Sequence, residues 1–427
     1  MEDLTRLAGR QWVGGQEDFS TNMALTKIAA ITNGQCNRCG AKVKAQLPNG
    51  KKYCRSCLNI GRIVEGDYLW RNQMKVNFPI SKTGGLTWVG KLTSLQAQIS
   101  QQLVNNFNQH QNTLVHAVTG AGKTEMLFAL LAESLKLGQR VCIATPRIDV
   151  INELYPRVRA AFAQVEIGVY HGRKYQEPGL EQLTICTTHQ LLKFYRAFDL
   201  LVIDEVDSFP YAGNDQLHFG AQNAVKESGV RVYLTATPTA DLLTQVKAGQ
   251  LQILKLNQRF HGGKLPVPKE KLFLRQFLNR GKLHPKLLAA ILTAIEEGRP
   301  LLLFVPRVEQ IPVYLAALRR EMELADIAMA GVYAADKKRL EKVEQFRKQQ
   351  LQVLVTTTIL ERGVTFKHVW VIVLAADDQI YTPASLVQIA GRVGRAQDDT
   401  DGLVLFCYHK YTANLRSAVK QIKEMNR

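Results

Sequence analysis

The sequence is poor in acidic residues relative to basic ones. Its 37 aspartate and glutamate residues are set against 55 lysine and arginine residues, which gives a formal net charge of +18 at pH 7. An excess of that size attracts polyanions. Nucleic acid is therefore the first partner to consider, and the anionic headgroups of a membrane are the second, because charge alone does not separate the two.

Segments that would carry the chain into or across a membrane are also missing. The longest apolar runs, such as Val369–Ala376, fall well short of the ~20 residues that cross a bilayer, and Met1–Arg10 has no apolar signal core. We therefore expect a soluble, cytoplasmic protein whose seven cysteines are reduced thiols or metal ligands rather than disulfides. With 427 residues and no low-complexity tract, the chain is expected to form two or three domains.

Four of the cysteines form two close pairs. Cys36 and Cys39 make one C-x2-C pair, and Cys54 and Cys57 make the other. Each pair can turn both sulfurs towards one point, so together they predict a structural Zn²⁺ site with four thiolate ligands. Two disulfides and four unrelated cysteines are the alternatives, which a reducing compartment and the spacing disfavour. Because every charged residue between the outer cysteines is basic, we expect a small cationic zinc module over residues 31–65.

A phosphate-binding loop is predicted where an extended apolar run meets a helical one. Thr113–Val118 is typical of a strand, and Met126–Leu137 has helical spacing; between them lies Thr119-Gly120-Ala121-Gly122-Lys123-Thr124. Glycines let backbone N–H groups approach phosphates, and the start of the helix adds the positive end of its dipole. We expect this loop to bind ATP, with Lys123 on the β- and γ-phosphates and Thr124 on Mg²⁺.

Two carboxylates follow another apolar run, Leu200–Ile203, in the sequence Asp204-Glu205-Val206-Asp207. At the tip of a buried parallel strand, Asp204 would hold Mg²⁺ through water, and Glu205 would orient or deprotonate the attacking water. The alternative is a solvated acidic turn. It is disfavoured because two adjacent carboxylates repel each other unless a cation lies between them.

Strand candidates alternate with helical stretches on both sides of these motifs. The strand candidates are residues 141–144, 183–187, 230–234, 301–305, 327–332, 351–356, 369–374 and 403–407, and further helices are expected at 309–323 and 336–349. This alternation predicts an α/β fold with two parallel-sheet lobes. We divide the chain into an N-terminal segment (1–30), the zinc module (31–65), a first lobe with a preceding segment (66–256), a linker (257–282) and a second lobe (283–427).

The second lobe contains no phosphate loop in its sequence, so we expect it to complete the site of the first lobe. The segment Gln388–Arg395 contains Arg392 and Arg395. If the segment opens a helix, the two guanidinium groups project together towards the γ-phosphate and stabilise the charge of the transition state. Taken alone, two such arginines would be a solvated face, but their position after the loop and the carboxylates favours a catalytic role.

From Leu92 to Tyr408 the order of these motifs resembles that of superfamily-two helicases, whose motors are two RecA-like lobes. The resemblance implies that Gln96 recognises adenine, with plain surface as the alternative, and that Gln388 lies at the ATP. It implies that Thr235–Pro238 couples hydrolysis to strand movement. It also implies that a further set of residues holds the nucleic-acid backbone, namely Pro146, Arg147, Thr188, His189, Arg307 and Thr357.

The whole chain more closely resembles the ComFA family of late-competence helicases from naturally transformable Gram-positive bacteria. The resemblance lies in Leu7–Arg10, the cysteine pairs ahead of the motor, Asp204–Asp207, Arg259–Gly262 with Leu265–Pro268, and Thr358–Thr365. It implies an ATP-dependent single-stranded-DNA translocase or helicase that drives the uptake of transforming DNA. The implied partners are ComFC-like, DNA-processing and channel proteins, and the implied place is the inner face of the cell membrane, with peripheral attachment. An oligomer is compatible with this interpretation.

Two other functions stay open at this point. One is a replication-restart helicase of the PriA type, whose phosphate-loop sequence is similar but whose cysteines lie inside the second half of the motor. The other is a nucleotide-gated DNA-binding adaptor, in which ATP acts as a switch and turnover is incidental.

Overall fold

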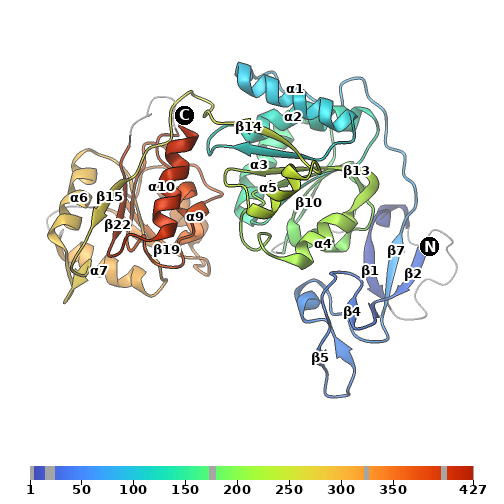
Figure 1. The fold of residues 1–427 in the computed structure, drawn as a ribbon, viewed down its shortest axis with the longest axis horizontal. Coiled ribbons are helices and arrows are strands. Elements are labelled where there is room, and N and C mark those ends of the chain that lie inside the picture. The colour runs from blue at the N-terminus through green and yellow to red at the C-terminus, as the bar shows by residue number, and fades with distance from the viewer. Residues whose placement is uncertain (1–3, 15–24, 173–178, 322–326, 396–401, 427) are drawn as a thin grey trace. The chain divides into compact units, whose positions relative to one another are not determined.

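The computed structural model describes residues 4–14, 25–172, 179–321, 327–395 and 402–426. The chain divides into two compact units, one of residues 1–116 and 122–256 and the other of residues 117–121 and 257–427. Each unit is built on its own parallel sheet (Figure 1). The predicted α/β fold, with two parallel-sheet lobes and a four-cysteine cluster ahead of them, is confirmed.

The first unit has a seven-stranded sheet formed by short apolar runs. In spatial order its strands are β10 (Ile167–Tyr170), β11 (Leu183–Thr187), β9 (Val141–Thr145), β12 (Phe198–Asp204), β13 (Val225–Thr235), β8 (Thr113–Ala117) and β14 (Gln252–Leu256). From β10 to β8 all neighbours pair in parallel. Every residue of β9 and β11 is buried, as expected for strands covered on both faces. The strands that the sequence predicts in this lobe are confirmed.

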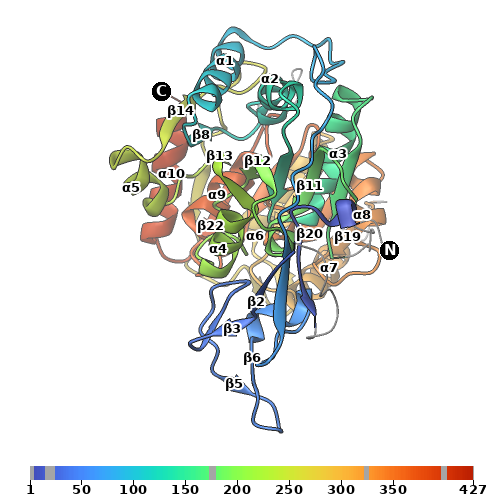
Figure 2. The same ribbon diagram turned by 90° about the vertical axis from the view of Figure 1, so that its right-hand side faces the viewer.

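Five helices accompany this sheet (Figure 2). They are α1 (Ser94–Asn108), α2 (Lys123–Lys136), α3 (Ile148–Ala161), α4 (Asp215–Ala224) and α5 (Ala240–Lys247). Helix α2 packs between α1 and α3, and α4 packs on a 3-10 helix, η3 (Thr188–Lys193). Helix α1 begins with a capping box, in which the hydroxyl of Thr93 accepts from the backbone N–H of Gln96 and the Gln96 side chain accepts from that of Thr93.

A small antiparallel sheet precedes the first lobe, in the order β1 (Gln11–Gly14), β7 (Tyr68–Asn72) and β2 (Leu25–Ala29). The four-cysteine module lies between β2 and β7 in the chain. Its elements are the hairpins β3 (Ile31–Thr32)–β4 (Gln35–Cys36) and β5 (Ala45–Gln46)–β6 (Lys52–Tyr53), and η2 (Arg55–Ile60). The 3-10 helix η1 (Leu4–Leu7) precedes β1. The sequence did not predict this sheet, because its strands are short and only partly buried. Residues 1–3 and 15–24 of the expected N-terminal segment lie outside the described residues.

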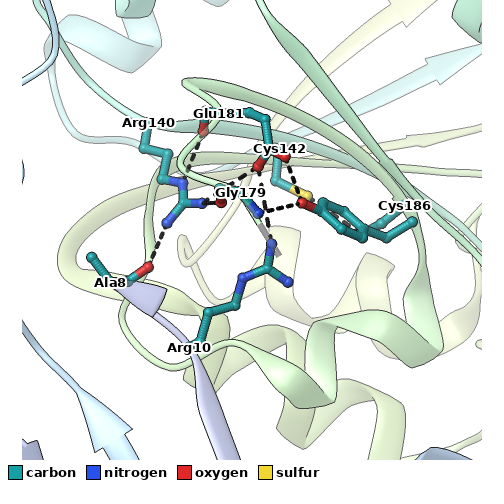
Figure 3. A network of polar contacts seen from close by, with 8 residues as sticks. Ala8, Arg10, Arg140, Cys142, Gly179, Glu181 and Cys186 are labelled. Carbon is teal, nitrogen blue, oxygen red and sulfur yellow. Dashed lines mark hydrogen bonds and ion pairs between the residues drawn. The ribbon is translucent and has the colours of Figure 1, made fainter. Parts of the chain in front are cut away.

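Buried charges fasten the start of the chain to the first lobe (Figure 3). The guanidinium of Arg140 donates to the carbonyl of Ala8 over 2.7 Å and to that of Glu181 over 3.1 Å. Arg10 and Arg140 each lie 4.0 Å from the carboxylate of Glu181, and Tyr170 donates its hydroxyl to the same carboxylate. The Arg10 guanidinium also lies over the rings of Tyr170 and Phe194. The network therefore holds the antiparallel sheet against the lobe.

The second unit has a six-stranded sheet in which all neighbours are parallel. Its spatial order is β15 (Lys269–Leu272), β22 (Val404–Tyr408), β21 (Trp370–Val373), β18 (Leu301–Phe304), β20 (Val353–Thr356) and β19 (Met329–Val332). The other elements are the hairpin β16 (Leu278–Asn279)–β17 (Lys282–Leu283), η4 (Thr358–Leu360), α6 (Pro285–Glu296), α7 (Gln310–Glu321), α8 (Arg339–Arg347), α9 (Pro383–Ala390) and α10 (Ala413–Met425). The five strands that the sequence predicts in this lobe are confirmed.

Two features of this unit differ from the sequence expectation. Strand β15 lies in the stretch 257–282, for which the sequence indicates a linker. It is an edge strand with the sequence Lys-Glu-Lys-Leu, mostly exposed, so it lacks the apolar run that marks the inner strands. Helix α7 is expected to run to Glu323, a residue outside the described ranges, and the helix described ends at Glu321.

Within the described residues, no helix combines the length and the apolar character that a membrane crossing requires.

Candidate nucleotide and nucleic-acid sites

The predicted phosphate loop joins β8 to α2. Gly120 and Gly122 have φ angles of 80° and 71°, in the left-handed region that favours glycine. A Cβ atom on Gly122 would lie 2.5 Å from the amide nitrogen of Gln96, so the loop also has no room for a larger residue there. Lys123 is the first residue of the 14-residue α2, and Lys123 and Thr124 are only partly buried. The start of this helix therefore presents backbone N–H groups and a lysine to an anion.

Gln96 is 1% exposed, which rules out the plain-surface alternative for this residue. Its side-chain oxygen accepts from the backbone N–H of Thr93 over 2.9 Å, while its amide nitrogen is directed at Gly122 of the phosphate loop. The first turn of α1 and the phosphate loop are thus held together by one side chain. Sequence reasoning identified Gln96 only through the helicase resemblance, because a glutamine at the third position of a capped helix is common.

The acidic motif lies at the same edge of the sheet as the loop. Asp204 is the last residue of β12, and β13 separates β12 from β8, so all three strands end side by side. The Asp204 carboxylate accepts from the backbone N–H of Glu205 over 2.8 Å, and Glu205 has a φ of 56°. Asp204 and Glu205 are half-buried rather than exposed as in a solvated turn.

One hydrogen bond links the acidic motif to the segment after β13. The hydroxyl of Thr237 donates to the carboxylate of Asp207, and the backbone N–H of Thr237 donates to the hydroxyl of Thr235 over 2.9 Å. His116, on β8, has its Nε2 atom 3.1 Å from the carbonyl oxygen of Ala236, and burial is the main cause that lowers the pKa of His116. The segment after β13 is therefore bonded to the acidic motif and lies beside His116, on the strand that leads into the phosphate loop.

The segments expected to hold nucleic acid follow β9 and β11, which are neighbours in register from Leu183 opposite Val141 to Thr187 opposite Thr145. Arg147 is half-buried, and His189 is exposed at the start of η3. Desolvation of its ring by neighbouring protein atoms lowers the pKa of His189, which favours its neutral form. Pro146 and Thr188 are buried.

The four cysteine sulfurs of the N-terminal module converge. All four Sγ atoms lie within 4.8 Å of one another, with Cys36 and Cys57 3.8 Å apart and Cys39 and Cys54 3.6 Å apart. A tetrahedron of sulfurs at about 2.3 Å from zinc has edges of roughly 3.8 Å. The sulfurs are too far apart for disulfides, which need about 2.05 Å, and too close together to be unrelated. The cluster is compatible with zinc.

A buried arginine that sequence reasoning did not single out supports this cluster. Arg38 is 2% exposed and donates its Nε–H to the sulfur of Cys57 over 3.4 Å, and it also donates to the carbonyl oxygens of Cys57 and Ile60. A cation hydrogen-bonded to a sulfur favours its thiolate form. The signal in the sequence was present, since Arg38 lies inside the first C-x2-C pair.

The cysteine module packs directly on the first lobe. Helix η2, which contains Cys57, contacts η3, and a Cβ atom on Gly40 would come within 2.9 Å of the Phe219 ring on α4. Burial and then the charges of Arg10 and Arg38 lower the pKa of Lys193 at the end of η3. The 3-10 helix that carries Thr188 and His189 is therefore supported from the side by the cysteine module.

In the second unit the predicted arginines follow a helix instead of opening one. Helix α9 ends at Ala390, so the expectation that Gln388–Arg395 begins a helix is wrong. The physical reason is that Pro383 after the capping residue Thr382 starts the helix earlier, and Gly391 and Gly394 favour a turn. Arg392 is 1% exposed and donates its Nε–H to the carbonyl of Glu361 over 3.0 Å. Arg395 is half-buried and donates its Nε–H to the carbonyl of Gly391 over 2.9 Å.

Among the other predicted residues of this unit, two follow neighbouring strands and one lies on α9. Arg307 follows β18 and is exposed, with a guanidinium nitrogen 4.0 Å from the carboxylate of Asp378. Thr357 follows β20, the neighbour of β18, and is 8% exposed. Gln388 is buried on α9. Arg307 is thus exposed, whereas Thr357 and Gln388 are buried.

Comparison with known proteins shows the family. Competence protein ComFA of Streptococcus pneumoniae is 41% identical over 398 residues, which cover 92% of this chain and 90% of that protein. Competence protein ComFA of Bacillus subtilis is also 41% identical, over 92% of this chain and 85% of that protein. The chain belongs to the ComFA family. The resemblance that the sequence motifs indicate is therefore confirmed.

Two domain models match parts of this ComFA-family chain. The helicase conserved C-terminal domain matches residues 284–397, and the type III restriction enzyme res subunit matches residues 90–240. The replication restart protein PriA of Rickettsia typhi is 27% identical, but over only 50% of this chain and 36% of that protein. The helicase fold implies the use of a nucleotide and Mg²⁺.

Solved structures agree on the fold. Saccharomyces cerevisiae Dbp5 bound to RNA and ADP BeF3 aligns with a TM-score of 0.58 at 14% identity, over 78% of this chain and 91% of that one. The Mycobacterium smegmatis helicase Lhr bound to ssDNA and AMP-PNP aligns with a TM-score of 0.58 at 16% identity, over 79% of this chain and 50% of that one. At this level of identity the likeness concerns the fold alone.

Proposed function

We propose that this ComFA-family chain is an ATP-driven motor that moves along single-stranded DNA and powers the uptake of transforming DNA in natural competence. The observation that carries the proposal is the carboxyl edge of the seven-stranded sheet. There the phosphate loop after β8 and the acidic motif after β12, which the Thr237–Asp207 hydrogen bond joins to the segment after β13, share the edge with Arg147 after β9 and His189 after β11. Nucleotide chemistry and strand binding therefore share one edge of one sheet.

The nucleotide would bind at the start of α2. Lys123 would contact the β- and γ-phosphates, the N–H groups from Thr119 to Thr124 would cradle them, and Gln96 would contact the adenine. Glu205 would orient and deprotonate the attacking water. Thr124 and Asp204 would hold Mg²⁺, which when bound neutralises phosphate charge. Thr124 is partly exposed at the helix start and Asp204 lies at a strand end, so an oxygen-donor set suited to this hard cation is present.

Arg392 and Arg395 would act on the same triphosphate when the two lobes close, with Gln388 beside the nucleotide. Two guanidinium groups match the charge that develops on the transferred phosphoryl group. The support for this part is their order in the chain after the loop and the carboxylates, and their place in the turn: Arg392 lies between Gly391 and Gly394, and the half-buried Arg395 directly follows Gly394. Arg147 and His189 on one lobe and Arg307 on the other would bind the single-stranded DNA alternately. Closure of the lobes would then move the protein along the DNA.

The cysteine module would bind one structural Zn²⁺ through Cys36, Cys39, Cys54 and Cys57. Metal analysis of the purified chain should give about one zinc per molecule, and Cys39→Ser should lose it. Cys407→Ala is the control, because Cys407 is a buried cysteine of the second sheet outside the cluster. Zinc retained in the Cys39→Ser variant would contradict the assignment.

Other parts of the proposal rest on the family. The ComFA relatives are competence proteins, so the partners would be other proteins of DNA uptake, of the ComFC-like, DNA-processing and channel classes, at the inner face of the cell membrane with peripheral attachment. We also propose residues 31–65 as the zinc module and residues 257–282 as the connection that leads into the second lobe.

The alternative of a nucleotide-gated adaptor predicts different kinetics. A motor should hydrolyse ATP faster when single-stranded DNA is present, since closure on the strand completes its site, whereas a switch should show little stimulation. Steady-state ATPase assays with and without a long single-stranded oligonucleotide separate the two. Displacement of a bound protein from tailed DNA, with both tail polarities, then tests whether the motor translocates. Absent stimulation together with absent displacement would contradict the proposal.

A further inference from the structure

A buried arginine outside the nucleotide motifs holds the backbone of the catalytic arginine segment. Arg259 lies in Arg259–Gly262, a stretch that marks the family resemblance but has no role in the motor as proposed. Its side chain is 2% exposed, although a guanidinium cannot lose its charge in practice. A buried cation requires a strong compensating interaction.

That interaction is a fork of hydrogen bonds to three carbonyl groups. The Nη1 atom of Arg259 donates to the carbonyl of Val393 over 2.7 Å and to that of Gly394, and Nη2 donates to the carbonyl of Gly391 over 3.1 Å. These three residues surround Arg392 and precede Arg395. One side chain from a distant part of the chain therefore binds the whole turn that carries both predicted catalytic guanidinium groups.

The turn needs such a partner for a clear structural reason. Helix α9 ends at Ala390, so the carbonyl groups that follow have no continuing helix to satisfy them. Gly394 has a φ of 66°, and two glycines within four residues give the backbone many alternative conformations. The end of a helix also carries a partial negative charge, which a cation stabilises. Arg259 supplies both the donors and the charge.

The electrostatics show that this arrangement is costly. Burial is the main cause that lowers the pKa of Arg259, and the charge of Arg395 is the second. If this position only filled space, an apolar side chain would do so without placing a second cation beside Arg395 inside the protein. A lysine would be a poor substitute, because its ammonium group cannot span three carbonyl groups in one plane as a guanidinium does.

We propose that Arg259 is a positioning residue for ATP hydrolysis, which holds the turn Gly391–Arg395 in the conformation that presents Arg392 and Arg395 to the triphosphate. The proposal rests on the function proposed above. It predicts a specific kinetic pattern: a change at Arg259 slows the chemical step more than it weakens nucleotide binding, because the contacts of Arg392 and Arg395 are displaced while Lys123 keeps its own.

The test uses the full-length, zinc-loaded protein with saturating single-stranded DNA. Arg259→Lys should lower the kcat for ATP by about 10²-fold, the scale of loss that follows a misplacement of ~1 Å, with KM for ATP changed less than about threefold. Arg339→Lys is the matched control. Arg339 is another buried arginine of the same unit, on α8, and its change should leave kcat within about twofold.

A double variant shows whether Arg259 acts through the arginine turn. If it does, adding Arg259→Lys to Arg395→Ala should lower kcat by less than about threefold relative to Arg395→Ala alone, because the positioned group is already missing. Losses that multiply would overturn the proposal, and so would a kcat of Arg259→Lys equal to that of the native chain. Melting temperatures recorded on the same samples identify a variant that has lost its fold.

Should Arg259→Lys unfold, chemical rescue decides instead. Guanidinium at low millimolar concentration should restore part of the kcat of Arg259→Ala, since it fits the vacated position, whereas methylammonium should not; absent rescue would overturn the proposal. A failure of the proposed function gives a different result. In that case the native chain does not hydrolyse ATP, or Arg392→Ala and Arg395→Ala both keep its full rate.

Discussion

The carboxyl edges of the two parallel sheets differ in chemistry although the sheets are built alike. In both, short buried runs such as β9 and β18 form the inner strands. The seven-stranded sheet ends in a glycine loop with a helix start and in the carboxylates of Asp204–Asp207. Within the described ranges, the six-stranded sheet has no such loop; its edge ends in Arg307 and in turns.

The comparison teaches that the strands supply the scaffold and the loops supply the function. In the proposed function, the seven-stranded sheet binds the triphosphate through its phosphate loop. The six-stranded sheet has instead a turn with two arginines, which a third, Arg259, holds by its backbone. In the proposed function, this difference corresponds to a division of labour between a binding lobe and an activating lobe.

The largest effect is expected from removing the phosphate-binding lysine at the carboxyl edge of the seven-stranded sheet. Lys123→Ala should lower ATP hydrolysis by about 10³-fold, because the β- and γ-phosphates lose their cation. Binding of a labelled single-stranded oligonucleotide, measured by fluorescence anisotropy, should change little. Lys136→Ala, at the other end of α2, is the control and should hydrolyse ATP normally. A Lys123→Ala variant that keeps hydrolysing would show that the two edges do not differ as described.

The second prediction has a smaller expected effect and concerns the attachment of the three-stranded antiparallel sheet to the first lobe. Arg10→Ala should destabilise the first unit by about 3 kcal/mol, because Glu181 would stay buried with one of its two cations removed. Urea unfolding measures the change, with Arg6→Ala, an exposed arginine of η1, as the control. Equal stability of the two variants would mean that the buried network of Figure 3 does not fasten the N-terminal sheet.

A third change tests whether the two functions at the first edge are linked. Thr237→Ala should reduce the stimulation of ATPase by single-stranded DNA about tenfold, the loss expected for one hydrogen bond to a carboxylate. Basal hydrolysis should change less. Thr237→Ser keeps the hydroxyl and should retain the stimulation; if both variants behave alike, the bond to Asp207 does not couple the sites.

The smallest effect is a pH dependence of stability. His116 has a pKa lowered mainly by burial, so between its usual value near 6.5 and its lower folded value the unfolded chain binds the additional proton. His116 therefore lowers stability as the pH falls through that window and has no such effect above it. His116→Asn should flatten the dependence by roughly 0.5 kcal/mol in urea unfolding at pH 5.5 and 7.5. His110→Asn is the control, and an unchanged slope in His116→Asn would contradict the interpretation.

Most inner strands and the phosphate loop could be predicted from the sequence because their signals are local. β9, β11, β18 and β20 are continuous apolar runs, and the loop has its glycines between a strand and a helix. Edge strands such as β15 were not predicted, since one open side removes the apolar pattern.

Features that depend on distant residues could not be predicted. The antiparallel sheet needs β1 and β7, some 60 residues apart, to pair. The turn of Arg392 and Arg395 was expected to open a helix, because the sequence does not show that Arg259 binds its carbonyl groups from more than 130 residues away. The roles of Gln96, Arg147 and His189 came from the family resemblance and not from local pattern.

The most direct test of the division of labour is a single-turnover measurement on Arg395→Ala. With excess protein, ATP and single-stranded DNA, the account predicts that the variant binds ATP within about tenfold of the native affinity but hydrolyses the bound ATP at least ~10³-fold more slowly. Hydrolysis of bound ATP within a few-fold of the native rate would contradict it, because the second lobe would then contribute no activating arginine.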